Sequence, residues 1–345
     1  MRLSNTTAIV AAALCVMIAP AASAPAVSAP DRAPAPSSKP QPSAPGTSAP
    51  SRARRALLAP VKSWTVQLRF IDLAAVKAAP VDLIVIDHAR HPKQVSEVSY
   101  TPADILPLKT QPNGRRRIVL SYLSMGEAER YRDYWKPEWD DKETRPQWIG
   151  QENAQWPGNY LVNYTDPEWQ SLIFGTPESY LDRIIAAGFD GVYLDRADAF
   201  EDGDGATPAK ADAMTSFIKR LADHARRLNP RFLIVMQNAE ALLRDAALRA
   251  KLDGAAKEDL LFGVDHSETA NPKDMVRESL NYMRLGKRAG LKMFLLEYVK
   301  TPDSIKELRT LARRENFLLH LSERHLDHLT LDETSEAKPA ASGTP

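Results

Sequence analysis

The chain has 345 residues, of which 43% are hydrophobic and 26% are charged, a composition ordinary for a globular protein. This length is enough for one large domain or two modest ones. The formal net charge of +1 excludes a global electrostatic attraction to nucleic acid or to an anionic membrane, so we expect no nucleic-acid partner.

The N-terminus has the pattern of an export signal, which we place at residues 1–24. Arg2 supplies the positive charge, residues 7–18 form an apolar run too short to span a bilayer, and Ala22-Ser23-Ala24 fits a cleavage site. The single cysteine, Cys15, lies inside this signal, so the mature chain would contain neither a disulfide nor a catalytic thiol. We expect a secreted, periplasmic or cell-envelope protein, with membrane association only through an uncleaved signal.

Two segments are too poor in large apolar residues to fold. Residues 25–61 are rich in Pro, Ala and Ser and are predicted to be a disordered linker, and residues 333–345 a disordered tail. The segment between them, residues 62–332, has the usual size of a (β/α)8 barrel.

Eight short apolar runs within this segment are predicted to be strands: 65–68, 82–87, 118–123, 191–195, 232–238, 254–258, 293–298 and 317–320. Their near-continuous apolarity is typical of parallel strands that are buried on both faces. Amphipathic stretches between them predict helices near 177–187, 210–228, 272–289 and 304–314. The alternation predicts an α/β fold. We favour a (β/α)8 TIM barrel over an open doubly wound sheet, because there are eight units and no glycine-rich turn follows the first strand.

One long insertion, residues 126–170, interrupts the alternation after the third strand. It holds five of the six tryptophans: Trp135, Trp139, Trp148, Trp156 and Trp169. Such rings can pack a small core or stack against sugars, and we expect one or two of them to face a groove.

Polar residues follow the predicted strands, and in a barrel the carboxyl ends of the strands converge on one pocket. The candidates are Asp87, Tyr122, Glu127, Asp195, Arg196, Asp198, Asn238, Glu240, Glu258, Glu297 and Tyr298. Carboxylates placed close together repel, which raises some pKa values and leaves other groups ionised. That separation suits acid/base chemistry on a glycosidic bond.

A metal site is the alternative use of these acids. Asp87 with His88 and His91, or Asp195 with Asp198, could supply ligands, and "EDGDG" at 201–205 is part of a calcium-loop pattern. The spacing matches no closed zinc pattern, so we predict neither a metal nor another cofactor. A metal-assisted deacetylase or hydrolase stays as a competing hypothesis.

Several stretches carry a family resemblance: "VLSYLSMGEAERYRDYW", "GFDGVYLDRADAF", "IVMQNAEAL" and "DGAAKEDLLFG". The chain resembles glycoside hydrolase family 114, the endo-α-1,4-polygalactosaminidases. The resemblance implies a barrel that cleaves α-1,4-linked galactosamine polymers with an aspartate on the fourth strand and a glutamate on the sixth. Those residues are Asp195 and Glu258 here. Because the run 254–258 is short and weakly apolar, Glu268 is the alternative second acid.

The resemblance implies a retaining mechanism in which Asp195 attacks the anomeric carbon and Glu258 transfers the proton. The other acids could bind the ammonium group of galactosamine or brace the rim of the barrel, and Tyr122 and Tyr298 could contact sugar faces or pack the rim. We expect Arg196 to form an ion pair with a neighbouring acid.

Two other functions stay open at this point. One is a glycosidase for a neutral or N-acetylated hexosamine polymer, and the other is an inactive polysaccharide-binding barrel.

Overall fold

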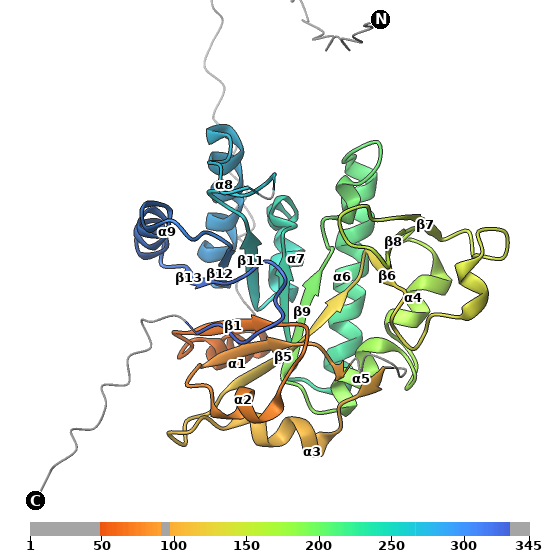
Figure 1. The fold of residues 1–345 in the computed structure, drawn as a ribbon, viewed down its shortest axis with the longest axis horizontal. Coiled ribbons are helices and arrows are strands. Elements are labelled where there is room, and N and C mark those ends of the chain that lie inside the picture. The colour runs from red at the N-terminus through yellow and green to blue at the C-terminus, as the bar shows by residue number, and fades with distance from the viewer. Residues whose placement is uncertain (1–48, 91–96, 266, 332–345) are drawn as a thin grey trace, which may run out of the picture. The chain divides into compact units, whose positions relative to one another are not determined.

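A sheet of eight parallel strands forms the centre of the protein in the computed structural model, which describes residues 49–90, 97–265 and 267–331 (Figure 1). In sheet order the strands are β1 (Trp64–Gln67), β2 (Leu83–Ile86), β5 (Ile118–Ser124), β9 (Gly191–Asp195), β10 (Leu233–Gln237), β11 (Gly254–Glu258), β12 (Lys292–Glu297) and β13 (Leu318–Leu321). All eight predicted strands are present in chain order, which confirms the (β/α)8 barrel.

The first and last strands meet through side chains. The described residues show no backbone ladder between β1 and β13. Instead the Trp64 indole Nε1 donates to the carbonyl of Leu318 at 3.0 Å, and Thr65 Oγ1 lies 3.3 Å from His320 Nε2. The barrel is therefore nearly closed.

Helices connect the strands on the outside of the barrel. They are α2 (Leu73–Ala78), α3 (Pro102–Ile105), α4 (Pro167–Ile173), α5 (Tyr180–Ala186), α6 (Pro208–Leu228), α7 (Ala246–Lys251), α8 (Lys273–Arg288) and α9 (Pro302–Glu315). Side-chain caps start several of them, for example Thr207 for α6 and Thr301 for α9. None of the helices in the described residues is both long and apolar enough to cross a bilayer.

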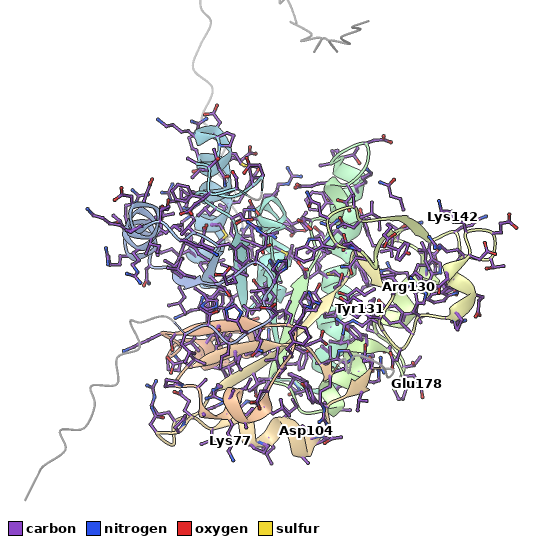
Figure 2. The ribbon with its side chains drawn as sticks, viewed as in Figure 1. Lys77, Asp104, Arg130, Tyr131, Lys142 and Glu178 are labelled. Atoms are coloured by element: carbon purple, nitrogen blue, oxygen red, sulfur yellow. The ribbon has the colours of Figure 1, made fainter. Side chains whose placement is uncertain are left out.

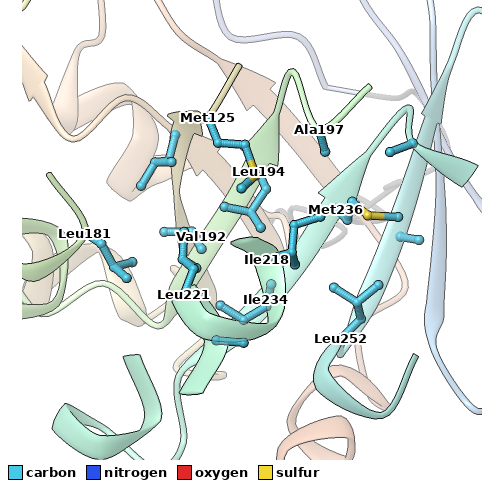
Figure 3. Close-up of a cluster of buried hydrophobic side chains, with 14 of the residues drawn as sticks. Met125, Leu181, Val192, Leu194, Ala197, Ile218, Leu221, Ile234, Met236 and Leu252 are labelled. Atoms are coloured by element: carbon cyan, nitrogen blue, oxygen red, sulfur yellow. The ribbon is translucent and has the colours of Figure 1, made fainter. Parts of the chain in front are cut away.

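Two hydrophobic layers follow from the alternation of side chains along each strand. Val192 of β9 and Ile234 of β10 point outward and pack against Ile218 and Leu221 of α6 (Figure 3). The alternate positions point inward and fill the barrel with Trp64, Leu83, Val85, Leu120, Tyr193, Val235, Phe294 and Leu296.

The weakly apolar strand β11 has a packing explanation. A Cβ atom added at Gly254 would lie 3.0 Å from the Phe294 ring, and the next inward residue is Ala256. Small residues on β11 therefore leave space for the large rings of the interior.

The insertion between β5 and β9 forms a separate small sheet. Strands β6 (Glu127–Glu129), β8 (Asn159–Val162) and β7 (Ile149–Glu152) form an antiparallel sheet. A two-stranded sheet, β3 (Ala89–Arg90) and β4 (Val98–Ser99), follows β2.

The tryptophans of the insertion mainly build its core. Trp139, Trp148 and Trp169 are 3%, 2% and 0% exposed, and their rings lie in sequence at centroid distances of 5.2 and 5.3 Å. Trp156 is 39% exposed. Of the five rings, only Trp156 and the partly buried Trp135 are exposed enough to face a groove.

The predicted linker requires a correction at its C-terminal end. Within the range 25–61, residues Ala49–Leu58 form helix α1, whose Leu58 is buried in the barrel interior. Arg54 Nε donates to Asp253 Oδ1 at 3.2 Å, so the helix is held at the amino end of β11. The sequence pattern did not predict this helix, because the helix has few apolar residues and is held mainly by hydrogen bonds from its arginines. The signal 1–24, linker residues 25–48 and tail 333–345 lie outside the described residues.

The anchor of α1 gives a first prediction. Asp253 is 0% exposed and accepts hydrogen bonds from Arg54, from Arg226 at 2.8 Å and from the Ile234 amide at 3.0 Å. Asp253→Ala leaves buried arginine charge without its partner, so the free energy of unfolding should fall by about 3–5 kcal/mol in chemical denaturation. The control Asp223→Ala removes an exposed ion pair with Lys251 and should cost less than about 1 kcal/mol. Equal effects of the two variants would contradict the anchor.

Candidate active site

Five inward-facing polar residues lie at the carboxyl ends of neighbouring barrel strands. We call them the acid cluster: Tyr122, Asp195, Gln237, Glu258 and Tyr298. In each strand the previous inward residue is apolar or aromatic and belongs to the barrel interior. The alternation that packs the barrel therefore also brings these polar groups together above the packed core.

Glu258 is held by three side-chain donors. Gln237 Nε2 and Asn238 Nδ2 donate to its Oε2 at 2.9 and 3.0 Å, and the Tyr298 hydroxyl donates to its Oε1. The side-chain oxygen of Asn238, Oδ1, also accepts from the Glu258 backbone amide at 2.9 Å. Donors on both oxygens fix the carboxyl group in one orientation and suit a negatively charged carboxylate.

Asp195 has a different environment. Its Oδ2 accepts from the Tyr122 hydroxyl at 2.8 Å. Burial, the charge of Glu258 and the charge of Asp198 together raise the pKa of Asp195 to about 7, against the opposing charge of Arg196. Asp195 and Glu258 end β9 and β11, the two strands on either side of β10.

The backbone turns sharply after three consecutive strands. Arg196, Asn238 and Asp259 directly follow β9, β10 and β11 and have φ angles of 53°, 59° and 51°. Left-handed backbone is unfavourable for residues other than glycine and clusters at functional sites. Here it ends each strand immediately after Asp195, Gln237 or Glu258, so the chain leaves the barrel mouth at once.

Arg196 is surrounded by carboxylates. Its Nε lies 2.8 Å from Glu127, its Nη1 3.0 Å from Asp198 and its Nη2 2.5 Å from Asp202. Glu127 is 1% exposed, whereas the Asp198 and Asp202 side chains are 25% and 31% exposed. The expected ion pair of Arg196 is present. Its one guanidinium faces three acids, and Lys257 adds a second positive charge near Asp198.

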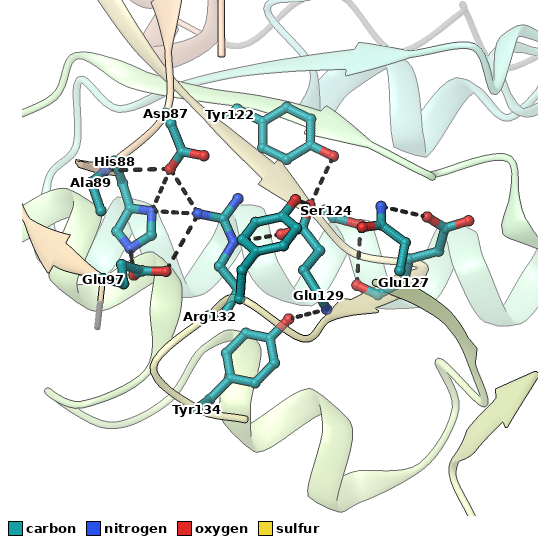
Figure 4. Close-up of polar contacts among 12 residues, drawn as sticks. Asp87, His88, Ala89, Glu97, Tyr122, Ser124, Glu127, Glu129, Arg132 and Tyr134 are labelled. Atoms are coloured by element: carbon teal, nitrogen blue, oxygen red, sulfur yellow. Dashed lines mark hydrogen bonds and ion pairs between the residues drawn. The ribbon is translucent and has the colours of Figure 1, made fainter. Parts of the chain in front are cut away.

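A second charged network lies at the base of the insertion, beside Tyr122 (Figure 4). Arg132, with a side chain 0% exposed, contacts Glu129 at 2.5 Å and Asp87 at 2.8 Å. His88 lies between Asp87 at 2.9 Å and Glu97 at 2.6 Å. Burial disfavours the charged imidazole, but these two carboxylates outweigh it and raise the pKa of His88. The network joins the end of β2 to the insertion.

Comparison with known proteins identifies the family and the fold. A family model described as glycoside-hydrolase family GH114 matches residues 46–337. The chain belongs to glycoside hydrolase family 114. The resemblance carried by the sequence motifs is thereby confirmed, and the protein is a glycoside hydrolase.

Relatives of this family-114 chain extend over most of its length. It is 35% identical to an uncharacterized protein of Deinococcus radiodurans over 284 residues, which cover 81% of this chain and 86% of that one. It is 34% identical to an uncharacterized protein of Methanocaldococcus jannaschii over 262 residues, covering 74% and 71% of the two chains. Among solved structures it resembles the glycoside hydrolase domain of PelA from Pseudomonas aeruginosa. That match has a TM-score of 0.56 and 18% identity, and covers 78% of this chain and 97% of that domain. At this identity the likeness shows the fold.

Four acids predicted to bind substrate in this family-114 barrel have structural partners instead. Glu297 is 0% exposed because it faces outward from β12, between the inward Leu296 and Tyr298, and it accepts from the Leu260 amide at 3.0 Å. Burial raises the pKa of Glu297 well above its usual range. Glu240 accepts from Ser279 at 2.5 Å and lies 3.7 Å from Lys257.

Asp87 and Glu127, 3% and 1% exposed, are the other two. Asp87 pairs with Arg132, and Glu127 accepts from Asn153 at 2.9 Å and from Asn159 at 3.1 Å as well as from Arg196. For these four residues the structure favours the bracing alternative over direct contact with a polymer.

The second acid is better placed at Glu258 than at Glu268. Glu258 faces the interior that it shares with Asp195, whereas Glu268 accepts from the backbone amides of Lys300 and Thr301 at 3.1 and 2.8 Å. Glu268 thus holds the start of α9, outside the acid cluster.

The metal alternatives find no support in the described residues. There, no group of three or more His, Cys, Asp and Glu side chains is arranged to hold a metal ion. His91 lies outside this part of the chain. In the "EDGDG" loop the ammonium of Lys210 donates to the carbonyls of Asp202 and Gly205 at 3.1 and 2.9 Å, so a cation of the chain itself binds the loop oxygens.

Sequence reasoning missed several residues of the site. Gln237 could have been found, because it is the last inward position of an alternating strand. Arg324 was among the residues at the predicted strand ends; it pairs with Asp259 at 2.7 Å and lies 4.4 Å from the centroid of the Tyr298 ring. Glu129 and Arg132 carry no local signal, since only the folded insertion brings them to Tyr122 and Asp87.

The raised pKa of Asp195 predicts that the folded protein is less stable when this carboxyl group is ionised. The folded carboxyl titrates at about 7 and an unfolded one near 3.8, so the folded state binds the proton more tightly. The ionised carboxyl therefore costs stability increasingly from pH 4 to pH 7, and fully above pH 7. Asp195→Asn should raise the melting temperature by a few degrees at pH 8 and by little at pH 4. Asp212→Asn, at an exposed position of α6, is the matched control. A gain independent of pH would contradict this account.

Proposed function

We propose that this family-114 enzyme cleaves α-1,4-linked galactosamine-type polysaccharide with the carboxyl groups of Asp195 and Glu258. The observation that carries the proposal is the pair itself: two inward-facing acids on β9 and β11, with different hydrogen-bond partners, at the mouth of one barrel. Most glycoside hydrolases use two such acids to hydrolyse a glycosidic bond.

In the proposed retaining mechanism Asp195 attacks the anomeric carbon and forms a covalent glycosyl-enzyme. Glu258 first protonates the leaving oxygen and then takes a proton from the incoming water. Tyr122 and Asn238, with Gln237 and Tyr298, hold the two carboxyl groups in place rather than stacking on sugar.

Asp195 must be ionised when it attacks the substrate. In the free protein the surroundings raise the pKa of Asp195 to about 7, which works against that anion. An ammonium group of galactosamine beside Asp198 and Asp195 would favour that anion, because opposite charge stabilises the ionised carboxylate. The charge of the proposed substrate therefore supports the proposed roles.

The acids around Arg196 support a cationic sugar. Asp198 and Asp202 are partly exposed and, with Glu127, surround the Arg196 guanidinium, while Lys257 is the other positive charge near Asp198. A neutral or N-acetylated polymer would gain less from this charge. We extend the proposal to location: the export pattern of residues 1–24 supports a secreted or cell-envelope enzyme acting on an extracellular polymer.

The first test of this function uses the two acids. Asp195→Asn and Glu258→Gln should each fold and bind a deacetylated α-1,4-galactosamine polymer, but their turnover should fall at least about 1,000-fold, because each loses a role in the chemical step. Reducing-end release from deacetylated and fully acetylated polymers measures turnover and specificity together.

Glu307→Gln, at an exposed position of α9, is the matched control and should keep wild-type turnover. Near-wild-type turnover of either site variant would remove that residue from the mechanism. Binding without hydrolysis by the wild type would indicate a binding barrel, and equal hydrolysis of the acetylated polymer would remove the galactosamine specificity.

The second test separates the roles of the two acids by pH. If Asp195 is the nucleophile, kcat/KM should rise with pH through about 7, because the free protein must first lose that proton. Asp198→Asn removes a negative charge beside Asp195, so the midpoint of this rise should move to lower pH by roughly one unit. A kcat/KM that instead falls through this range would assign proton donation to Asp195 and attack to Glu258.

A further inference from the structure

The Tyr122 hydroxyl lies between two carboxyl groups and has one proton to donate. Asp195 Oδ2 is 2.8 Å from this hydroxyl, and Glu129 Oε1 is 3.4 Å from it. Burial, followed by the charges of Asp195 and Glu129, raises the pKa of Tyr122 well above its usual range. The phenol therefore stays protonated, and the two carboxyl groups compete for one hydrogen bond.

Glu129 is built as a fixed acceptor. It is 1% exposed in β6, its Oε2 receives Arg132 Nε at 2.5 Å, and its Oε1 receives the Tyr131 hydroxyl at 2.7 Å. Arg130 and Tyr131 follow β6 in the insertion (Figure 2), and Figure 4 shows Tyr122 above the network of Arg132. The insertion thus brings an acceptor of its own to a tyrosine of the barrel.

We propose that Glu129 is a positioning residue that acts through Tyr122 on Asp195. It accepts the Tyr122 hydrogen bond while Asp195 carries a proton or a sugar, and it releases that bond when Asp195 becomes an anion. This inference rests on the proposed function, because it assigns Asp195 a change of charge during the reaction.

The physical basis is the change in acceptor strength of Asp195. An ionised carboxylate accepts a stronger hydrogen bond than a protonated or esterified one. When Asp195 is an anion, Tyr122 donates to it over the shorter distance. When Asp195 is protonated, the hydroxyl hydrogen turns toward Glu129, and the phenol oxygen can accept from the Asp195 O–H group. The Tyr122 O–H bond stays intact throughout, so only hydrogen bonds are exchanged.

Such an exchange would lower the cost of each change in charge at Asp195. In the second half of a retaining reaction the ester of Asp195 returns to a carboxylate, and Tyr122 can then donate to it as the negative charge develops. Glu129 would keep the hydroxyl oriented in the meantime.

Several charged or titratable groups face this pair and enter any titration. Around Tyr122 and Asp195 they are Glu129, Tyr131, Arg132, Glu258, Asp198 and Arg196. A simple charge effect of Glu129 on Asp195 must therefore be separated from an effect transmitted by Tyr122.

A double-mutant cycle makes that separation. We would compare wild type, Tyr122→Phe, Glu129→Gln and the double variant, and titrate Asp195 by infrared difference spectroscopy of ¹³C-labelled aspartate against Asp195→Asn. Tyr122→Phe should raise the pKa of Asp195, and Glu129→Gln should lower it by about one unit, because Tyr122 then donates to Asp195 alone. When Tyr122→Phe is already present, the effect of Glu129→Gln should fall to less than half. Equal shifts with and without the tyrosine hydroxyl would overturn the proposal and leave a direct charge effect.

Tyr131→Phe tests the same idea without changing any charge, and it is conservative enough to fold if Glu129→Gln is not. It removes a competing donor from Glu129 Oε1, so Glu129 should accept more of the Tyr122 hydrogen bond and the pKa of Asp195 should rise. No shift, or a fall, would overturn the proposal. Tyr282→Phe on α8, which loses a 3.2 Å hydrogen bond to Glu278, is the matched control and should leave Asp195 unchanged.

Activity provides the final arm. Glu129→Gln should lower kcat on the deacetylated polymer about tenfold with little change in KM, because it acts on the charge change and makes no contact with sugar. The spectroscopic titration needs no substrate, so its failure overturns the role of Glu129, whereas a wild type that does not hydrolyse the polymer overturns the proposed function alone. A rise in KM at constant kcat would show instead that Glu129 shapes substrate binding, which would contradict the proposal.

Discussion

The repulsion between the carboxyl groups of Asp195 and Glu258 is the constraint on which the site depends. Both acids face the interior of one barrel, where a negative charge is poorly solvated, so ionisation of one disfavours ionisation of the other. The surroundings separate the two groups. Glu258 receives donors from Gln237, Asn238 and Tyr298, whereas Asp195 receives the hydroxyl of Tyr122. The two acids therefore have different surroundings, which is what acid/base chemistry on a glycosidic bond requires.

The backbone is strained at three positions next to these acids. Arg196, Asn238 and Asp259 all adopt left-handed conformations directly after the strands that bear the acid cluster. Each of their side chains then supports the site: Arg196 gathers three carboxylates, Asn238 binds both the amide and the carboxyl of Glu258, and Asp259 pairs with Arg324. At Asn238 one residue therefore provides both the turn that ends β10 and the contacts that orient Glu258.

The insertion after β5 is joined to the barrel by charge. Arg132 links Glu129 of the insertion to Asp87 at the end of β2, and Glu127 links the insertion to Arg196 after β9. At Gly126 an added Cβ would lie 2.4 Å from Arg196 O, so only glycine permits this close approach. Most of the insertion's tryptophans pack its own core, and this rigid layer can hold Glu129 in place behind Tyr122.

The barrel and its eight strands could be predicted from the amino-acid sequence, because buried parallel strands leave continuous apolar runs. The convergence of strand ends predicted a set of polar residues at one pocket, and it could have included Gln237; the choice of Asp195 and Glu258 from that set came from the resemblance to family 114. Which acids face the interior follows only from the folded chain. Glu297 points outward because it lies between the inward-facing Leu296 and Tyr298. Asp87 and Glu127 form ion pairs with arginines that are distant in the chain. The structure also shows helix α1, in which Arg54 donates a hydrogen bond to Asp253 from a stretch predicted to be a linker. Such pairings join residues far apart in the chain, so no local pattern encodes them.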